Sequence, residues 1–228
     1  MRIIALETSG STGSIAAMGD GRLIVQTSLS TAQKTAQSLA PTLKSILRDA
    51  NWEPNAVELV AVTSGPGSFT GLRAGVTSAK VFAYATGAQV LAINTLEVIA
   101  AQVENASGEL WAVMDAQRKQ VFASKFAPNK SGTPEMLLPT QILDDAAMIG
   151  KLASGELVTG TGLAKLLRYV PSEVRVGPEN SWQPQAATLG RLAFAKYRSG
   201  MRNDVWQLAP EYYRKSAAEE KFDQGLLK

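Results

Sequence analysis

The sequence predicts an α/β protein with mixed sheets, made of two similar halves. Short β-branched runs alternate with segments in which apolar residues recur at helical spacing, a pattern typical of α/β folds. Each half opens on a predicted β-hairpin whose first strand ends in a carboxylate, Glu7 in one and Asp115 in the other. The 228 residues suffice for two small domains with a shared interface. We therefore expect two subdomains, residues 1–105 and 106–228.

Five strands and three helices are predicted in the first half. The strands are expected at residues 3–8, 14–18, 23–29, 57–64 and 90–93. The helices are expected at residues 35–50, 72–86 and 96–103. Pro41 lies inside the first of these helices and should bend it or mark a late start, whereas Gly87 is expected to cap the second.

Four strands and two helices are predicted in the second half. The strands are expected at residues 110–115, 121–126, 156–162 and 174–176, the third of them running into a glycine turn. The helices are expected at residues 144–152 and 186–199. The stretch that contains Pro128, Gly132, Pro134 and Pro139 predicts irregular structure or a variable insertion, and the segment from Met201 onward is expected to be irregular as well.

Composition favours a globular protein of the cytoplasm. Hydrophobic residues make up 45% of the chain and charged residues 19%, which suits a sizeable core and not a disordered chain. No apolar run reaches the ~18 residues that span a bilayer, and the strand pattern that begins at Ile3 leaves no room for a signal peptide. A net charge of +3 with scattered Lys and Arg predicts weak RNA binding by this chain alone.

The chain contains neither histidine nor cysteine. An ordinary zinc or iron site is therefore excluded, because such sites use imidazole or thiolate ligands. The usual general base of a serine or threonine nucleophile is missing too. Any catalysis would depend on Asp, Glu, Lys or Tyr.

The most specific local signal is the ten-residue turn at residues 64–73, which reads SGPGSFTGLR between a predicted strand and a predicted helix. Its glycines and its proline are unfavourable inside regular structure but suit a tight turn. Two roles fit this turn. Its glycines and hydroxyls contact a ligand, or its small residues let the helix start tightly and place Phe69 and Leu72 on an exposed apolar surface.

This turn resembles the signature of the bacterial TsaB (YeaZ) family, and four other segments resemble elements of the same family in the same order. They read IIALETS at 3–9, NTLE at 94–97, VMDAQRKQVF at 113–122 and APEYYR at 209–214. The resemblance covers nearly the whole chain and implies a duplicated ribonuclease H-like fold, as in the actin, sugar-kinase and chaperone ATPase group.

The resemblance also implies a function. TsaB-like proteins are non-catalytic dimerization subunits that bind TsaD, the active homologue, and with it the ATPase TsaE. Together these proteins transfer threonylcarbamoyl from threonylcarbamoyl-AMP to the N6 of the adenosine next to the anticodon of tRNAs that read A-starting codons. TsaD-like enzymes hold a metal through an HxxxH motif on the helix expected here at residues 35–50. Since this chain has no histidine, not even the one that many family members carry near Thr35, the resemblance implies the inactive partner, with no metal, cofactor or catalytic residue.

The turn after the first strand has the small, polar composition of a phosphate-binding nest. A polar β-turn explains the same composition equally well. Its residues are Glu7, Thr8, Ser9, Gly10, Ser11 and Thr12. In the related ATPases two further loops complete the nucleotide site, but residues 115–118 lack the second-phosphate pattern and residues 160–162 are at most a remnant of the adenosine loop. A degenerate ATPase site is therefore the better interpretation.

The first two predicted helices are expected to share an exposed apolar patch that pairs with TsaD or, when the chain is alone, with a second copy. The contact residues expected there are Leu39, Leu43, Ile46, Phe69, Leu72, Arg73, Val76 and Lys80. On this prediction Val76→Arg breaks the pairing and leaves the monomer folded. The alternative is that the second helix is buried entirely within its own domain.

Two further groups of residues are weighed as contacts. Asp115, Arg118 and Lys119 form either a solvated turn or a contact surface. Residues 212–214 (Tyr, Tyr, Arg) have side chains that stack on RNA bases, although docking of this tail on its own domain is the favoured interpretation.

Two rival functions belong to other classes. One is an ATP-dependent small-molecule kinase or ATPase of the same fold, which ATP hydrolysis by the purified chain would favour. The other is a peptidase, which has little chemistry available because the chain lacks histidine and cysteine.

Overall fold

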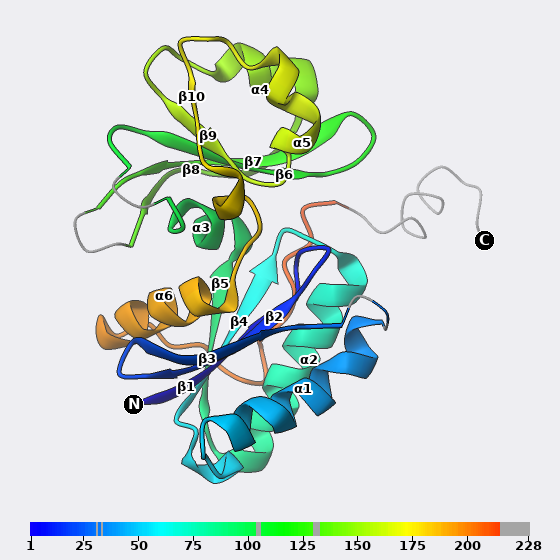
Figure 1. Ribbon diagram of the computed structural model, residues 1–228, viewed down its shortest axis with the longest axis vertical. Helices are drawn as coiled ribbons and strands as arrows, with labels where there is room; N and C mark the ends of the chain where they lie inside the picture. Colours follow the sequence, from blue (N-terminus) through cyan, green and yellow to red (C-terminus); the bar gives the residue numbers. More distant parts are fainter. Residues whose placement is uncertain (31, 33, 104–105, 130–132, 215–228) are drawn as a thin grey trace.

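Two five-stranded mixed sheets with the same strand order form the two lobes of the protein (Figure 1). The computed structural model describes residues 1–30, 32, 34–103, 106–129 and 133–214. The first sheet has the order β3-β2-β1-β4-β5, and the second, taken from its long edge strand, has the order β8-β7-β6-β9-β10. In each of these orders the first three strands form antiparallel pairs. The last two strands run parallel to the central strand, which is β1 in the first sheet and β6 in the second. The predicted duplicated fold is thereby confirmed.

The strands of the first sheet are β1 (Arg2–Glu7), β2 (Ser14–Gly19), β3 (Arg22–Ser28), β4 (Leu59–Gly65) and β5 (Gln89–Asn94). Those of the second sheet are β6 (Leu110–Asp115), β7 (Gln120–Ala127), β8 (Glu135–Asp144), β9 (Leu157–Thr159) and β10 (Arg175–Val176). The α-helices are α1 (Thr35–Asp49), α2 (Phe69–Thr86), α3 (Thr95–Ala100), α4 (Asp145–Lys151), α5 (Leu163–Leu166) and α6 (Ala186–Arg198). Three 3₁₀ turns are η1 (Pro54–Ala56), η2 (Leu167–Tyr169) and η3 (Glu179–Ser181).

Both faces of the first sheet are buried, which explains why β1 and β4 are apolar throughout. Ile4 and Leu6 face a core shared with α1 and α2. Ile3 and Ala5 point the other way, into a core completed by α6 (Figure 1). The second half of the chain therefore supplies one layer of the first lobe. The predicted second subdomain, residues 106–228, includes α6, but in the structure this helix packs on the sheet of the first lobe. Whether the two subdomains fold independently stays a prediction.

Helix α2 begins at Phe69, three residues earlier than the spacing predicts, because the Ser68 hydroxyl accepts a hydrogen bond from the Gly71 amide at 3.2 Å and caps the helix. Gly87 ends the helix in the left-handed conformation, as predicted. Helix α1 begins at Thr35, so of the two effects expected of Pro41, a bend or a late start, the late start is wrong. The exposed Pro41 is accommodated inside this helix.

The stretch predicted as irregular contains the ten-residue strand β8. Pro139 fits into it because β8 is an edge strand whose outer side needs no donor. The pairing with β7 is irregular at this point, between the pairs Lys125–Leu138 and Ala123–Gln141. The prediction fails here because proline argues against a strand in general. It is tolerated in an edge strand, and the edge position of β8 is not visible in the sequence. Gly132, from the same stretch, lies outside the described residues.

The segment after α6 returns along the first lobe, where Asn203 bridges to Val90 of β5 and Leu208 is buried in the core beneath α2. Irregular backbone was expected here, and no strand or helix is found at residues 201–214. None of the helices in the described part of the chain is long and apolar enough to cross a membrane.

Candidate functional site

The Gly-rich loop between β4 and α2 packs directly on the turn after β1. The Ser68 amide donates to the Ser9 carbonyl at 2.9 Å. A Cβ atom on Gly71 would lie 2.1 Å from the Thr8 carbonyl oxygen, and one on Gly75 would lie 2.2 Å from the Thr8 hydroxyl oxygen. Glycine is therefore required because the start of α2 approaches Thr8 so closely. Of the two roles expected for this turn, tight packing at the helix start accounts for these glycines.

We expect Gly71→Ala to destabilise the protein, because the added methyl group would collide with the backbone of the β1–β2 turn. Overpacking of this kind costs about 3 kcal/mol, which lowers Tm by roughly 6–12 °C in a protein of this size. The matched control is Gly150→Ala, since a Cβ atom at that position meets nothing within 4 Å. Thermal unfolding followed by circular dichroism compares the two, and equal Tm values would contradict the close packing at Gly71.

Glu7 lies fully buried at the end of β1, beneath the turn for which a degenerate phosphate nest and a polar β-turn are the two interpretations. Its Oε1 atom accepts hydrogen bonds from the Ser9 amide at 2.7 Å and from the Ser9 hydroxyl, and the Gly10 amide also interacts with this carboxylate. Its Oε2 atom has no partner among the described residues. Burial raises the pKa of Glu7 to about 7, although the Ser9 hydrogen bonds act in the opposite direction. Two amides that would face a phosphate in a nest therefore interact with a side chain of the protein.

The rest of this turn faces a cleft between the lobes with a volume of about 880 Å³. Of the predicted nest residues, Ser9, Gly10 and Ser11 line the cleft, Thr8 is buried with its hydroxyl unpartnered among the described residues, and Thr12 is exposed. The opposite wall includes residues 114–118, which run from the end of β6 into the β6–β7 turn, and Thr161 of the glycine turn after β9. The three segments compared above with ATPase loops therefore do meet around one cavity.

A C-terminal segment, residues 211–214, lines the same cleft and joins the two lobes. The Glu211 amide donates to the Ser64 carbonyl at 2.8 Å in the first lobe. In the second lobe the Arg214 guanidinium donates to the Ala116 carbonyl and to the Gln120 side chain. Tyr213 lies between these two contacts: its hydroxyl donates to the Glu211 carboxylate, and its ring packs against Phe122 of the second lobe. The tail docks on its own lobe through Arg214, as expected, and it also contacts the first lobe, which was not expected.

The predicted patch on α1 and α2 is wrong for half of its residues. The side chains of Leu39, Ile46, Leu72 and Val76 are buried in the first lobe. Leu43 packs partly buried against the same core. These apolar side chains point at the sheet because α1 and α2 lie on it side by side (Figure 1).

The other face of α2 is exposed and aromatic. The Phe69 and Tyr212 rings stack with centroids 4.8 Å apart, and Arg73 donates to the Tyr212 hydroxyl at 3.0 Å. Lys80 donates to the carbonyl oxygens of Trp206 and Leu208, in the stretch that follows α6, at 3.0 Å each. Phe69, Arg73 and Lys80 therefore lie on the outside of the helix, where residues 206–212 contact them.

Two exposed residues on this face were missed by sequence reasoning, Val81 and Tyr84. They continue the spacing of three or four residues that starts at Phe69 and Arg73, and this spacing is the signal that could have found them. The Tyr84 ring contacts the Trp206 ring edge-on, with centroids 5.3 Å apart. We use the name outer stripe for Phe69, Arg73, Val81, Tyr84, Trp206 and Tyr212.

No group of three or more Asp or Glu side chains in the described residues is placed to hold a metal ion. The second turn predicted as a contact, with Asp115, Arg118 and Lys119, lies at the boundary between the cleft and another cavity in the second lobe.

Comparison with known proteins places these features in a family. The sequence model of the family described as "TsaD: tRNA N6-adenosine threonylcarbamoyltransferase" matches residues 29–158. The tRNA threonylcarbamoyladenosine biosynthesis protein TsaB of Bacillus subtilis is 28% identical over 97% of this chain and 98% of its own length. The protein of the same description from Escherichia coli is 28% identical over 71% of this chain and 72% of its own length. The solved structure of YeaZ from Pseudomonas aeruginosa is 25% identical, covers 92% of this chain and 99% of its own, and superimposes with a TM-score of 0.80.

Proposed function

Because this chain belongs to the TsaD family and resembles TsaB proteins over nearly its whole length, we propose that it serves tRNA threonylcarbamoyladenosine biosynthesis as a non-catalytic subunit. In this proposal the chain pairs with a TsaD-like enzyme in the cytoplasm and, through it, works with a TsaE-like ATPase. The TsaD-like subunit then transfers threonylcarbamoyl from threonylcarbamoyl-AMP to the N6 of the adenosine next to the anticodon. The tRNA is bound through the complex.

The absence of histidine and cysteine is the observation that carries the non-catalytic role. On helix α1, where TsaD-like enzymes place their HxxxH motif, residues 34–38 read Lys-Thr-Ala-Gln-Ser. None of these side chains is a good ligand for a transition metal. A subunit with this helix contributes structure and contact surface rather than metal chemistry.

The interlobe cleft supports the same proposal over a kinase or an ATPase. Two amides of the first turn interact with Glu7, and the C-terminal segment connects the lobes across the cleft through Arg214. A phosphate in the cleft would meet a buried carboxyl group at the position where phosphate-binding loops present free amides. A peptidase has no support, since the cleft residues include no imidazole or thiol.

The outer stripe is the surface proposed for pairing. It presents aromatic and aliphatic side chains to solvent, among them Tyr84 and Trp206, which are 71% and 69% exposed. Exposed aromatic side chains supply large contact area at low entropic cost and are enriched at protein interfaces. The same stripe serves a TsaD-like subunit or, when the chain is alone, a second copy of itself, and the two partners compete.

The test is reconstitution with the TsaD-like and TsaE-like proteins of the same organism, assayed with tRNA, threonylcarbamoyl-AMP and ATP. The chain alone is expected to leave tRNA unmodified and ATP intact, while the complete set modifies tRNA. Turnover of either substrate by the chain alone above about 0.1 s⁻¹, which lies near the lower range of ordinary enzymes, would overturn the non-catalytic role. Full modification by the other two proteins without this chain would overturn its role as a subunit.

A further inference from the structure

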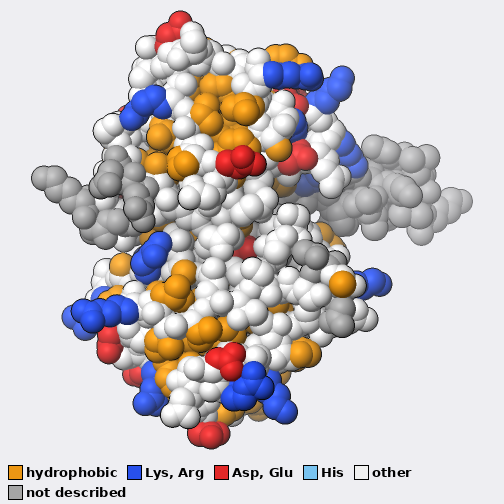
Figure 2. Space-filling model, viewed as in Figure 1, with side chains coloured by type: hydrophobic (Ala, Val, Ile, Leu, Met, Phe, Trp, Pro, Cys, Tyr) orange, Lys and Arg blue, Asp and Glu red, His pale blue; other side chains and the backbone are white. Residues whose placement is uncertain are grey.

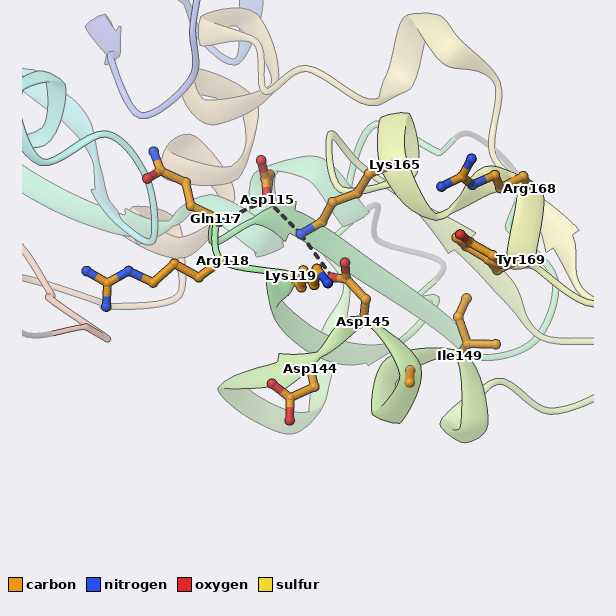
Figure 3. Close-up of a pocket in the computed structure, with 11 residues that line it drawn as sticks. Asp115, Gln117, Arg118, Lys119, Asp144, Asp145, Ile149, Lys165, Arg168 and Tyr169 are labelled. Atoms are coloured by element: carbon orange, nitrogen blue, oxygen red, sulfur yellow. Dashed lines mark hydrogen bonds and ion pairs between the residues drawn. The ribbon is translucent and has the colours of Figure 1, made fainter.

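A second cavity, with a volume of about 1040 Å³, lies in the second lobe beside the β6–β7 turn. Three segments far apart in the sequence enclose it (Figure 3): that turn, the start of α4, and α5 with the η2 turn that follows it. It is separate from the outer stripe, and nothing in the proposed pairing uses it.

Lys165 holds the three segments together. Its Nζ atom lies 2.7 Å from a carboxylate oxygen of Asp115 and 2.9 Å from one of Asp145, and it donates to the Gln120 carbonyl at 2.7 Å (Figure 3). Two ion pairs and one backbone hydrogen bond therefore fix the position of this lysine. Two of the carboxylates at the cavity, those of Asp115 and Asp145, are thus paired within the protein.

The cations that remain at the cavity favour an anionic ligand. Lys119 and Arg168 form no ion pair with any residue that the structure describes, and the remaining carboxylate of the cavity, Asp144, accepts a hydrogen bond from the Gln120 side chain at 2.9 Å. Lys119 ends a run of three non-glycine residues with φ values of 60°, 51° and 58°, the left-handed backbone that a short turn between the antiparallel strands β6 and β7 uses. In Figure 2 the Lys and Arg side chains of the upper lobe gather mainly along the edge on the side of α5.

An exposed aromatic ring lies beside these cations. Tyr169 is 56% exposed, and the Arg168 guanidinium carbon lies 4.7 Å from its ring centroid. Ile149 adds apolar surface to the same wall. Aromatic rings and guanidinium planes are the surfaces on which unpaired nucleobases stack, and nearby Lys and Arg side chains bind the phosphates.

We propose that this cavity binds a nucleotide of RNA, with the base against Tyr169 and Arg168 and the phosphate near Lys119 and Arg168. The proposal rests on the proposed function in one respect, since the RNA available to the complex is its tRNA substrate. A free nucleotide offers the same chemistry. An acidic protein segment would use the cations but leaves the exposed ring without a role, so RNA is the favoured ligand.

The test compares Lys119→Glu/Arg168→Glu and Tyr169→Ala with the wild-type chain, each bound to its TsaD-like partner. The matched control is Arg22→Glu/Arg191→Glu, which makes the same change of charge at two exposed positions of the first lobe. Labelled tRNA and, separately, AMP are titrated at several salt concentrations. Both cavity variants are expected to lose about tenfold in tRNA affinity. The charge variant alone should also lower the slope of log affinity against log salt by roughly one to two.

Each outcome decides one question. Unchanged tRNA affinity in both cavity variants, with the complex intact by size-exclusion chromatography, overturns the proposal. Loss of the complex in a cavity variant overturns it as well, because the face is then a protein contact. AMP binding that disappears in the variants while tRNA affinity stays unchanged overturns RNA as the source and assigns the cavity to a free nucleotide. If the wild-type chain does not bind a TsaD-like protein, the proposed function fails, and the same titrations on the chain alone still test the cavity.

Discussion

Val76→Arg is expected to unfold the protein, whereas Val81→Arg on the opposite side of α2 is expected to leave it folded. Val76 is 3% exposed and packs in the core between α2 and the first sheet, while Val81 is 62% exposed. An unpaired charge in such a core costs about 3–5 kcal/mol, a large part of the total stability of a domain. At the exposed position arginine is a slightly better helix former than valine. The structure thus reverses the expectation from sequence that Val76→Arg spares the fold.

The same pair of variants tests the outer stripe. Val81→Arg should keep a cooperative thermal transition but reduce co-elution with a TsaD-like partner and self-association of the chain alone. Circular dichroism and size-exclusion chromatography with light scattering provide the two measurements. Unaltered pairing by Val81→Arg would remove the outer stripe from the interface. A cooperative melt of Val76→Arg within a few degrees of wild type would show that this valine is not a core residue.

Raising the pH from 5 to 8 is expected to destabilise the wild-type protein through Glu7. The folded-state pKa of Glu7 is raised to about 7 by burial, from 4.5 in the unfolded chain. Between these two values the folded state binds more protons, so stability falls as pH rises and levels off above the folded pKa. The difference between the two pKa values corresponds to about 3 kcal/mol.

Glu7→Gln should remove this part of the pH dependence while keeping an oxygen for the Ser9 hydrogen bonds. The variant is expected to be more stable than wild type at pH 8 and closely similar at pH 5, measured by urea unfolding at each pH. Burial also raises the pKa of Glu97, against the effect of its Lys196 partner, so wild type and variant share that contribution. Parallel pH profiles for the two proteins would show that Glu7 does not titrate in this range.

The sequence predicts most of the fold because local patterns specify it. Apolar strands, helical spacing and capping residues place β1 to β7 and α1 to α3 within a few residues of their observed bounds. Strand β8 was not predicted, because it tolerates Pro139 only through its position at the edge of the sheet, and that position depends on the topology. The short helix α5 and the η2 turn escape because one or two turns of helix carry no clear periodicity.

The candidate site was predictable in its membership but not in its orientation. The motif resemblance identifies α2 and the turns around the cleft. Val76 and Val81, however, are the same residue type on one helix, and only the packing of α2 on the sheet makes the first buried and the second exposed. Similarly, a carboxylate at the end of a strand is visible at Glu7, but not that the Ser9 amide turns inward to meet it. Such directions depend on contacts between segments distant in sequence.

Helix α6 has a consequence for the order in which the protein can be made. The first lobe begins at residue 2, yet the face of its sheet that carries Ile3 and Ala5 is covered by Leu189 and Leu192, near the other end of the chain. On the ribosome the N-terminal sheet therefore emerges with one apolar face bare while the whole second sheet is being synthesised. Nascent chains in this state offer a surface to chaperones and to other unfinished copies. Completion of the first lobe comes last, after the second lobe already has all its strands.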